Sequence, residues 1–402
     1  MDRLKITNGK IITPFRIIPK GTVLVTGNKI TDICEGDIEV NDAVEIDAKG
    51  HYVSPGFIDI HVHGGGGFDF MDGDGEGFLR IAELHARYGT TSMVPTTLTS
   101  EKEHLITTLD LYEQAHKNNK HGAEFLGLHL EGPYFAMSQR GAQDPRYIRD
   151  PDPQEYRKIL QRSELIARWS AAPERKGAME FGRYLREKGV LAAIAHTDAI
   201  YEEVVEAVEN GYSLSTHLYS GMSGVTRKNA FRYAGVIESS LLMDELDVEI
   251  IADGIHLPAP LLKLIYKVKG PYKTALITDA MRAAGMPPGE SILGNKLTGL
   301  KVIVEDDVAK LPDRSSFAGS VSTADRLVRN MVNMADVPLR DALLMMSTTP
   351  ARIMGVEGRK GSLISGKDAD IVIFDQDIQI QETIIGGRRV YSRTASVEKQ
   401  LG

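Results

Sequence analysis

Two histidines separated by one residue are the first feature of the chain that could bind a metal. His61 and His63 stand at the end of an apolar run, and four glycines follow them. Side chains at positions i and i+2 of a β-strand point to the same side, so the two imidazoles would project together. Imidazole is the commonest metal ligand near neutral pH, although two solvated surface histidines would give the same pattern. The glycines leave room around the pair, which favours a site.

A carboxylate and two further histidines end other apolar runs. Glu131 closes the run 125–131, and His196 and His217 each close a later run. A carboxylate at the end of a buried strand is costly unless it is paired or metal-bound, so a buried salt bridge is the alternative for Glu131. Two histidines and a carboxylate at one site are a common hydrolytic ligand set that leaves a coordination position open for water.

Asp279 ends a further run, directly after Thr278. A water that attacks an amide needs a base to accept its proton, and the same group can then protonate the departing amine. An aspartate facing the other candidates could do both, whereas an aspartate that only caps the following helix would do neither. Together these residues predict a metal-dependent hydrolase that removes an acyl group from an amide.

Eight apolar runs must position these side chains, and amphipathic stretches alternate with them. The runs cover 56–63, 90–97, 125–131, 167–173, 190–196, 213–217, 248–253 and 274–279. Helical periodicity occurs over 76–88, 103–117, 179–188, 200–210 and 324–334. This alternation indicates βα units around a parallel sheet, and most candidate residues end a run, which is where TIM barrels place their chemistry. We therefore expect an α/β fold with a TIM (β/α)8 barrel over 55–356; a doubly wound open sheet is the alternative.

Short β-prone runs occur at both ends of the chain. They cover 4–7, 23–26, 29–33 and 43–47, and then 369–374, 379–385 and 388–391, with turn patterns such as Asn8-Gly9 between them. Neither group is large enough to form a stable sheet alone. The sequence thus predicts a small β-sandwich domain formed from both termini, with residues 1–54 and 357–402.

Charge and apolar patterning exclude several classes of partner. The formal net charge of −8 argues against a nucleic-acid binder. The single cysteine, Cys34, excludes an internal disulfide and suits a small buried hydrophobe. The first residues lack the apolar stretch of a signal peptide, and no apolar run approaches the length needed to cross a bilayer. We expect a cytoplasmic protein without nucleic-acid or membrane partners.

The His61–His63 pair, the split terminal β-segments and the segment 361–372 resemble the amidohydrolase superfamily. Within it, the segments 129–133, 216–219, 253–256, 278–280 and 317–320 resemble the N-acetylglucosamine-6-phosphate deacetylases, and the similarity runs nearly end to end. The resemblance implies hydrolysis of N-acetylglucosamine 6-phosphate to glucosamine 6-phosphate and acetate. It also implies that Glu131, His196 and His217 hold the principal metal and that Asp279 is the general base and acid. His61 and His63 can hold a second metal, so one or two divalent ions, zinc or iron, are expected.

The same resemblance implies a set of substrate contacts. They are Ala142, Gln143, Ser220, Gly221, Asp253, His256, Phe317, Ala318 and Gly319. An arginine from a partner subunit usually completes the phosphate site, so we expect a homodimer and assign this role to Arg227, with Arg232 beside it. A solvated loop is the alternative for this cationic cluster.

The chain departs from the family pattern at Gln143, where many members have histidine, and at Ser220-Gly221, where asparagine-alanine is usual. The departures leave the sugar epimer and the need for phosphate open, and N-acetylgalactosamine 6-phosphate is an alternative substrate. A cyclic amidase of the same superfamily would use a carboxylated lysine, but the run 167–173 contains no lysine. A barrel kept only as a scaffold would be missing ligands, yet every candidate ligand and the base are present.

Overall fold

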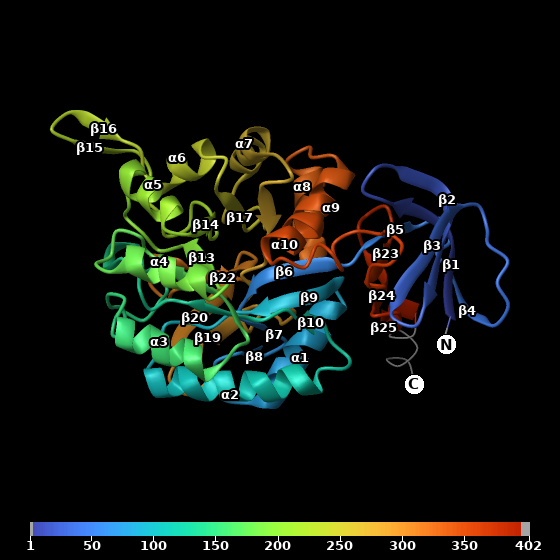
Figure 1. Cartoon of the computed structure of the whole chain (residues 1–402), viewed down its shortest axis with the longest axis horizontal. Coiled ribbons are helices and arrows are strands. Elements are labelled where there is room, and N and C mark those ends of the chain that lie inside the picture. Colours follow the sequence, from blue (N-terminus) through green and yellow to red (C-terminus); the bar gives the residue numbers. More distant parts are fainter. Residues whose placement is uncertain (1–2, 395–402) are drawn as a thin grey trace.

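The computed structural model describes residues 3–394, and two curved parallel sheets lie at the centre of its larger part (Figure 1). The first sheet has the order β10 (Glu124–Phe125), β9 (Thr90–Pro95), β6 (Phe57–Val62). The second has the order β11 (Leu128–Glu131), β12 (Ile166–Ala171), β13 (Leu191–Ile194), β14 (Tyr212–Ser215), β17 (Asp247–Ile250), β18 (Thr274–Leu276). Parallel bridges join the two sheets, from Thr96 to His129 at one edge and from Val62 to Ala280 at the other.

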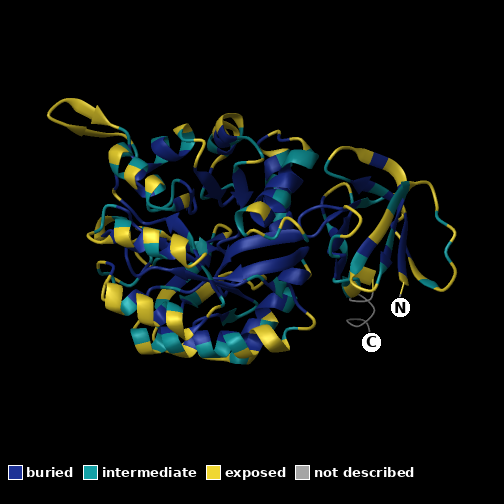
Figure 2. Cartoon of the chain, viewed as in Figure 1, coloured by how far each residue is buried: buried dark blue, intermediate teal, exposed yellow. Residues whose placement is uncertain are grey.

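Helices surround these sheets, with buried residues on their inner faces and exposed residues on their outer faces (Figure 2). They are α1 (Gly75–Ala86), α2 (Lys102–Asn118), α3 (Pro153–Arg162), α4 (Ala178–Glu187), α5 (Tyr201–Glu209), α6 (Val236–Leu242), α7 (Ala259–Lys269), α8 (Ala324–Asn333), α9 (Leu339–Met346) and α10 (Thr348–Ile353), with a 3-10 turn η1 (Met137–Gln139). The start of α3 is an example of N-capping: the side chain of Asp152 accepts a hydrogen bond from the backbone N–H of Gln154, and Pro153 takes the first helical position. Within residues 3–394, none of the helices combines the length and apolar character needed to span a bilayer.

The structure confirms a strand within each of the eight predicted runs and a helix within each of the five predicted stretches. The run 125–131 is nevertheless broken into β10 and β11. Gly127 lies at the break with φ +133°, and a Cβ there would come within 2.3 Å of the Cβ of Ala167, so only glycine fits. After the break β11 pairs with β12, and its His129 forms a bridge with Thr96, the residue that follows β9.

Strands from both ends of the chain form a separate eight-stranded sheet. Its members are β1 (Arg3–Ile12), β2 (Ile17–Thr26), β3 (Lys29–Glu35), β4 (Ala43–Asp47), β5 (Tyr52–Pro55), β23 (Ile371–Phe374), β24 (Ile380–Ile385) and β25 (Arg388–Ser392). The two ends meet where β5 pairs antiparallel with β23, and the sheet has its own apolar core. The sandwich arrangement and the domain limits at 54/55 and 356/357 stay predictions.

Two details of this sheet differ from expectation. The turn predicted at Asn8-Gly9 is wrong, because β1 runs through these residues and absorbs them as a bulge with Asn8 at φ 55°. Cys34 is only half-buried in β3, near an edge, rather than buried.

Three antiparallel elements were not predicted. A four-stranded sheet of β19 (Gly289–Leu293), β20 (Leu300–Glu305), β21 (Val308–Lys310) and β22 (Phe317–Ser320) follows β18. A hairpin of β15 (Thr226–Lys228) and β16 (Phe231–Tyr233) projects from the body near α5 and α6, and its strands are exposed throughout (Figures 1 and 2). Short strands β7 (Gly64–Gly65) and β8 (Phe68–Asp69) complete the fold.

Candidate metal and active site

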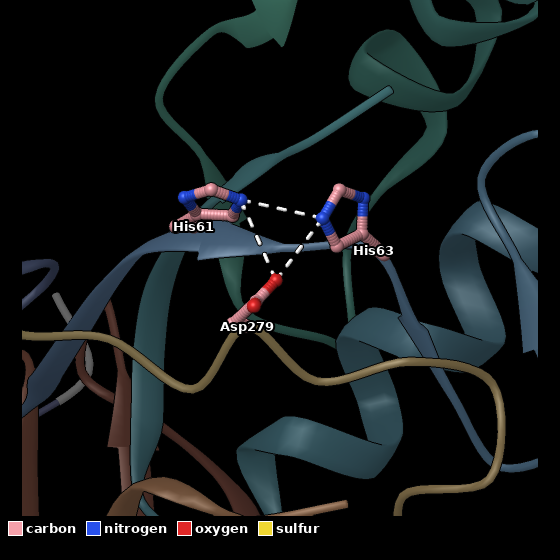
Figure 3. Close-up of side chains that lie close together, drawn as sticks. All are labelled: His61, His63 and Asp279. Atoms are coloured by element: carbon pink, nitrogen blue, oxygen red, sulfur yellow. Dashed lines mark hydrogen bonds and ion pairs between the residues drawn. The ribbon is translucent and has the colours of Figure 1, made fainter. Parts of the chain in front are cut away.

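Strand β6 directs His61 and His63 into the interior of the parallel sheets. Ile58 and Ile60, which alternate with His61 along the strand, point the other way and pack in a hydrophobic cluster. Both histidine side chains are buried, with 0% and 3% of their surface exposed. The loop after β18 is tied to the same strand, because the N–H of Asp279 donates to the carbonyl of His61 at 2.9 Å. Figure 3 shows the three side chains pointing toward one another.

The other candidates follow the C-terminal ends of strands. Glu131 is the last residue of β11, and His196, His217 and Asp279 come just after β13, β14 and β18. These last three have left-handed backbones, with φ values of 47°, 32° and 47°. Such conformations cost about 1–3 kcal/mol each for residues other than glycine and cluster at functional sites. The chain thus tolerates local strain where these side chains turn inward.

Glu131 lies at the centre of the histidines. Its Oε1 faces Nε2 of His217 at 3.0 Å, of His196 at 3.4 Å and of His61 at 3.5 Å. Its Oε2 faces Nε2 of His63 at 3.4 Å. Asp279 closes the other side, since its Oδ1 lies 3.1 Å from Nε2 of His63 and 3.5 Å from that of His61. All six predicted metal and base residues therefore meet in one place.

The donor atoms suit a divalent cation. Two overlapping groups, His61–His63–Asp279 and His61–Glu131–His217, each place their donor atoms within 4.8 Å of one another. In two of the histidines the ring nitrogen that points away from the cluster has a backbone partner. Nδ1 of His63 donates to the carbonyl of Thr96 at 3.2 Å, and Nδ1 of His196 donates to the carbonyl of Gln139 at 2.8 Å. In both rings Nε2 consequently faces the cluster, where it can bind a metal ion once it carries no proton.

The charges of the cluster are also those of a cation site. Burial alone would raise the pKa of Glu131, but His61, His196 and the other imidazoles hold it well below its usual range. Burial would likewise raise the pKa of Asp279, but the hydrogen bond from His63 and the nearby imidazoles lower it. His63 responds in the opposite direction: burial would lower its pKa, but Asp279 and Glu131 raise it to about 9. Both carboxylates are thus ionised at neutral pH.

A cavity of about 530 Å³ opens beside the cluster. Seven predicted substrate contacts line it, namely Ala142, Gln143, Ser220, Gly221, His256, Phe317 and Gly319. Gly221 has φ +58°, and a Cβ there would lie 2.8 Å from Nδ1 of His196. The loop can therefore lie this close to the histidine only because residue 221 is a glycine.

The remaining predicted contacts do not line this cavity. Ala318 is buried in the core of the antiparallel sheet. Asp253 lies behind the cavity wall, where its carboxylate accepts from Nδ1 of His256 at 2.7 Å and orients that ring. Arg227 and Arg232 are cross-strand neighbours on the exposed hairpin, away from the cavity of their own chain.

Some cavity residues had not been predicted. Lys310 and Arg314 line the wall formed by the β19–β22 insertion, where both make ion pairs with Glu305. No motif marks them in the sequence. Gln143 has an unexpected role as well: its amide N–H donates to Oε2 of Glu131 at 2.7 Å, while its Oε1 accepts from the N–H of Thr99 at 2.9 Å.

Comparisons with known proteins agree with this site. A sequence profile of the amidohydrolase family matches residues 52–390. The N-acetylglucosamine-6-phosphate deacetylase of Lysinibacillus sphaericus is 36% identical over 91% of this chain and 92% of its own length. The N-acetylgalactosamine-6-phosphate deacetylase of Escherichia coli O157:H7 is 34% identical over 83% of this chain and 86% of its own.

Solved structures show the same relationship. The N-acetylglucosamine-6-phosphate deacetylase of Pasteurella multocida superposes with a TM-score of 0.90 at 28% identity, covering 97% of this chain and 100% of that one. A variant of the N-acetylglucosamine-6-phosphate deacetylase of Mycobacterium smegmatis, in complex with N-acetyl-D-glucosamine-6-phosphate, superposes with a TM-score of 0.89 at 28% identity. The match covers 98% of this chain and 100% of that one. The chain therefore belongs to the amidohydrolase family and, within it, to the family of the N-acetylglucosamine-6-phosphate deacetylases.

Proposed function

We propose that the protein is a metal-dependent deacetylase that hydrolyses N-acetylglucosamine 6-phosphate to glucosamine 6-phosphate and acetate. The observation that carries this proposal is the buried cluster of four histidines and two carboxylates beside one cavity, in a chain related over its length to such deacetylases. We further infer that the two parallel sheets close into a (β/α)8 barrel, because bridges join them at both edges. The cluster would then lie at the C-terminal face, where barrels of this kind place their chemistry.

Glu131, His196 and His217 would hold the principal ion, and His61 and His63 would complete a second site. Imidazole and carboxylate donors suit zinc or iron, so either ion fits the set. When bound, such an ion supplies a Lewis acid that polarises the acetyl carbonyl and makes water more acidic. The protein contributes the fixed donor atoms and the proton transfers.

Asp279 would carry those proton transfers. Its carboxylate is ionised at neutral pH because neighbouring histidines lower its pKa, so it can accept a proton from the water that attacks the acetyl carbon. The C–N bond then breaks, and Asp279 returns the proton to the sugar nitrogen, which leaves as an amine. The products are acetate and the free amino sugar, and Asp279 ends in its starting form.

The sugar phosphate would lie in the cavity between Gln143, the Ser220-Gly221 turn and His256. An arginine of a second subunit, Arg227, would complete the phosphate site, which implies a homodimer. The hairpin supports this arrangement, because it is exposed and projects from the body of the chain (Figure 1), and its residues are not among those that line the chain's own cavity.

A coupled assay of acetate release tests the function. The substrates are N-acetylglucosamine and N-acetylgalactosamine, each with and without a 6-phosphate, and each with and without a chelator. We expect release from N-acetylglucosamine 6-phosphate that the chelator abolishes. N-acetylgalactosamine 6-phosphate is the second candidate, favoured by the 34% identical relative that is named for this substrate. Ring opening of a cyclic amide without acetate release would contradict the proposal.

A further inference from the structure

An ion pair between Arg168 and Glu249 fills the interior of the parallel sheets below the metal cluster. Arg168 comes from β12 and Glu249 from β17, and both side chains are 0% exposed. The guanidinium binds both carboxylate oxygens, with the Nη2 to Oε2 contact at 2.8 Å. Branched aliphatic residues usually fill this layer of a barrel, and removing two charges from water is costly. Packing alone does not explain the pair.

Both members of the pair contact β6, at His61 and at the residue before it. Oε2 of Glu249 faces Nδ1 of His61 at 3.5 Å, and Nη1 of Arg168 donates to the carbonyl of Ile60, the preceding residue, at 3.1 Å. The 3.5 Å contact is longer than an ordinary hydrogen bond, and within residues 3–394 this Nδ1 has no other partner. The ring's opposite nitrogen, Nε2, faces Glu131 and the rest of the cluster.

The ring of His61 has little freedom to turn away. His129 packs edge-on against it, with ring centroids 4.7 Å apart and planes at 90°. His129 is itself held on both nitrogens, by the hydroxyls of Ser170 at 2.6 Å and Thr96 at 3.3 Å. His61 is therefore confined between His129, the ion pair and the metal cluster.

We propose that Glu249, clamped by Arg168, is a positioning residue that keeps the proton of His61 on Nδ1 and so presents Nε2 as a ligand for the second ion. The two other histidines with a defined outer partner, His63 and His196, use backbone carbonyls for this purpose. A carboxylate makes the imidazole a stronger donor than a carbonyl does. Arg168 fixes the carboxylate and keeps it from turning into the cluster. The role of Glu249 rests on the proposed function, because it requires His61 to bind an ion.

The test replaces the pair as a unit. Arg168→Met with Glu249→Leu removes both charges at similar volume, a change that buried ion pairs often tolerate. The metal-free proteins are titrated with Co²⁺ by calorimetry and absorption, and their thermal unfolding is compared with that of the wild type. We expect two ions per wild-type chain, and in the double variant an affinity for the weaker ion reduced by about 10- to 100-fold, with the tighter ion unchanged. His61→Ala should lose the same ion.

A matched control lies on the same strand. Asp247 begins β17 and forms a two-bonded pair with Arg352 at 2.7 and 3.0 Å, away from the cluster. Arg352→Met with Asp247→Leu should leave both Co²⁺ affinities at wild-type values. If the Arg168–Glu249 variant does not fold, Glu249→Gln, which keeps the shape and removes the charge, should weaken the same ion.

Two results would overturn the inference: wild-type affinity for both ions in the Arg168–Glu249 variants, or uptake of only one ion by the wild-type chain. Acetate release by the wild-type protein is measured on the same preparation. Its absence would contradict the proposed function itself, so the two failures are distinguishable.

Discussion

Removing one guanidinium from the exposed hairpin tests whether the active site is completed by a second subunit. Arg227 lies on the exposed strand β15, where it is paired through its backbone with Arg232, and within residues 3–394 its side chain makes no hydrogen bond or ion pair. Arg227→Ala should therefore change the stability of its own chain by no more than about 0.5 kcal/mol, as expected of an exposed surface position. Any large kinetic effect must then come from a group outside the chain that the guanidinium binds.

The size of that effect follows from how a guanidinium binds phosphate. Arginine can hold two phosphate oxygens at once, and a hydrogen bond to a charged group contributes about 2–3 kcal/mol. Arg227→Ala should then lower kcat/KM for the phosphorylated sugar by about 30- to 150-fold, mainly through KM. The effect on the unphosphorylated sugar should be small. Lys228→Ala is the matched control, because adjacent residues of a strand point to opposite faces.

Mixed dimers decide between the two subunits. The Arg227→Ala chain keeps its metal site and its base but cannot supply the arginine to its partner. The Asp279→Asn chain supplies the arginine but lacks the base in its own site. Random exchange makes about half of the dimers mixed, each with one complete site, so about a quarter of the wild-type activity should return. No recovery on mixing, or equal rates of the wild type on both sugars, would refute the reasoning.

Three further outcomes are expected. Glu131→Gln should lose most of its bound metal and activity while thermal unfolding shows a folded chain; undiminished metal content would rule out the ligand assignment. Asp279→Asn should keep the principal ion, which Glu131, His196 and His217 would hold, but lose at least about a hundredfold in kcat; near-normal turnover would place the base elsewhere. Because the pKa of His63 is raised to about 9 in the metal-free protein, metal binding must displace its proton, so affinity should rise as pH increases toward 9. Calorimetry in two buffers of different ionisation enthalpy should detect the released proton, and a pH-independent affinity would contradict this.

The residues of the metal cluster can be predicted from the sequence because short-range patterns identify them. The spacing of His61 and His63 decides which way both side chains point, and a polar residue at the end of an apolar run must lie at a sheet edge. Glu131 and Asp279 were found in the same way. These patterns need no knowledge of distant parts of the chain, and the structure brings all of these residues together.

The features of the site that the sequence does not reveal depend on contacts between residues far apart in the chain. Arg168 and Glu249 are 81 positions apart, and each alone looks like an ordinary charged residue in a run. Lys310 enters the cavity wall only because the strands from 289 to 320 fold back as an insertion, which helical or parallel periodicity does not reveal. The use of Gln143 as a partner of Glu131 likewise depends on where its loop settles.

The pairing of β5 with β23 has a consequence for synthesis of the protein. Residues 52–55 leave the ribosome long before their partners at 371–374, because the whole of the central α/β part is made in between. Until then β5 has an open edge, and such edges invite pairing with other chains. The central α/β units can fold in order as they appear, whereas the terminal sheet is completed last. The nascent chain is therefore most prone to aggregate through its first strands, and a chaperone that shields this edge would raise the yield of folded protein.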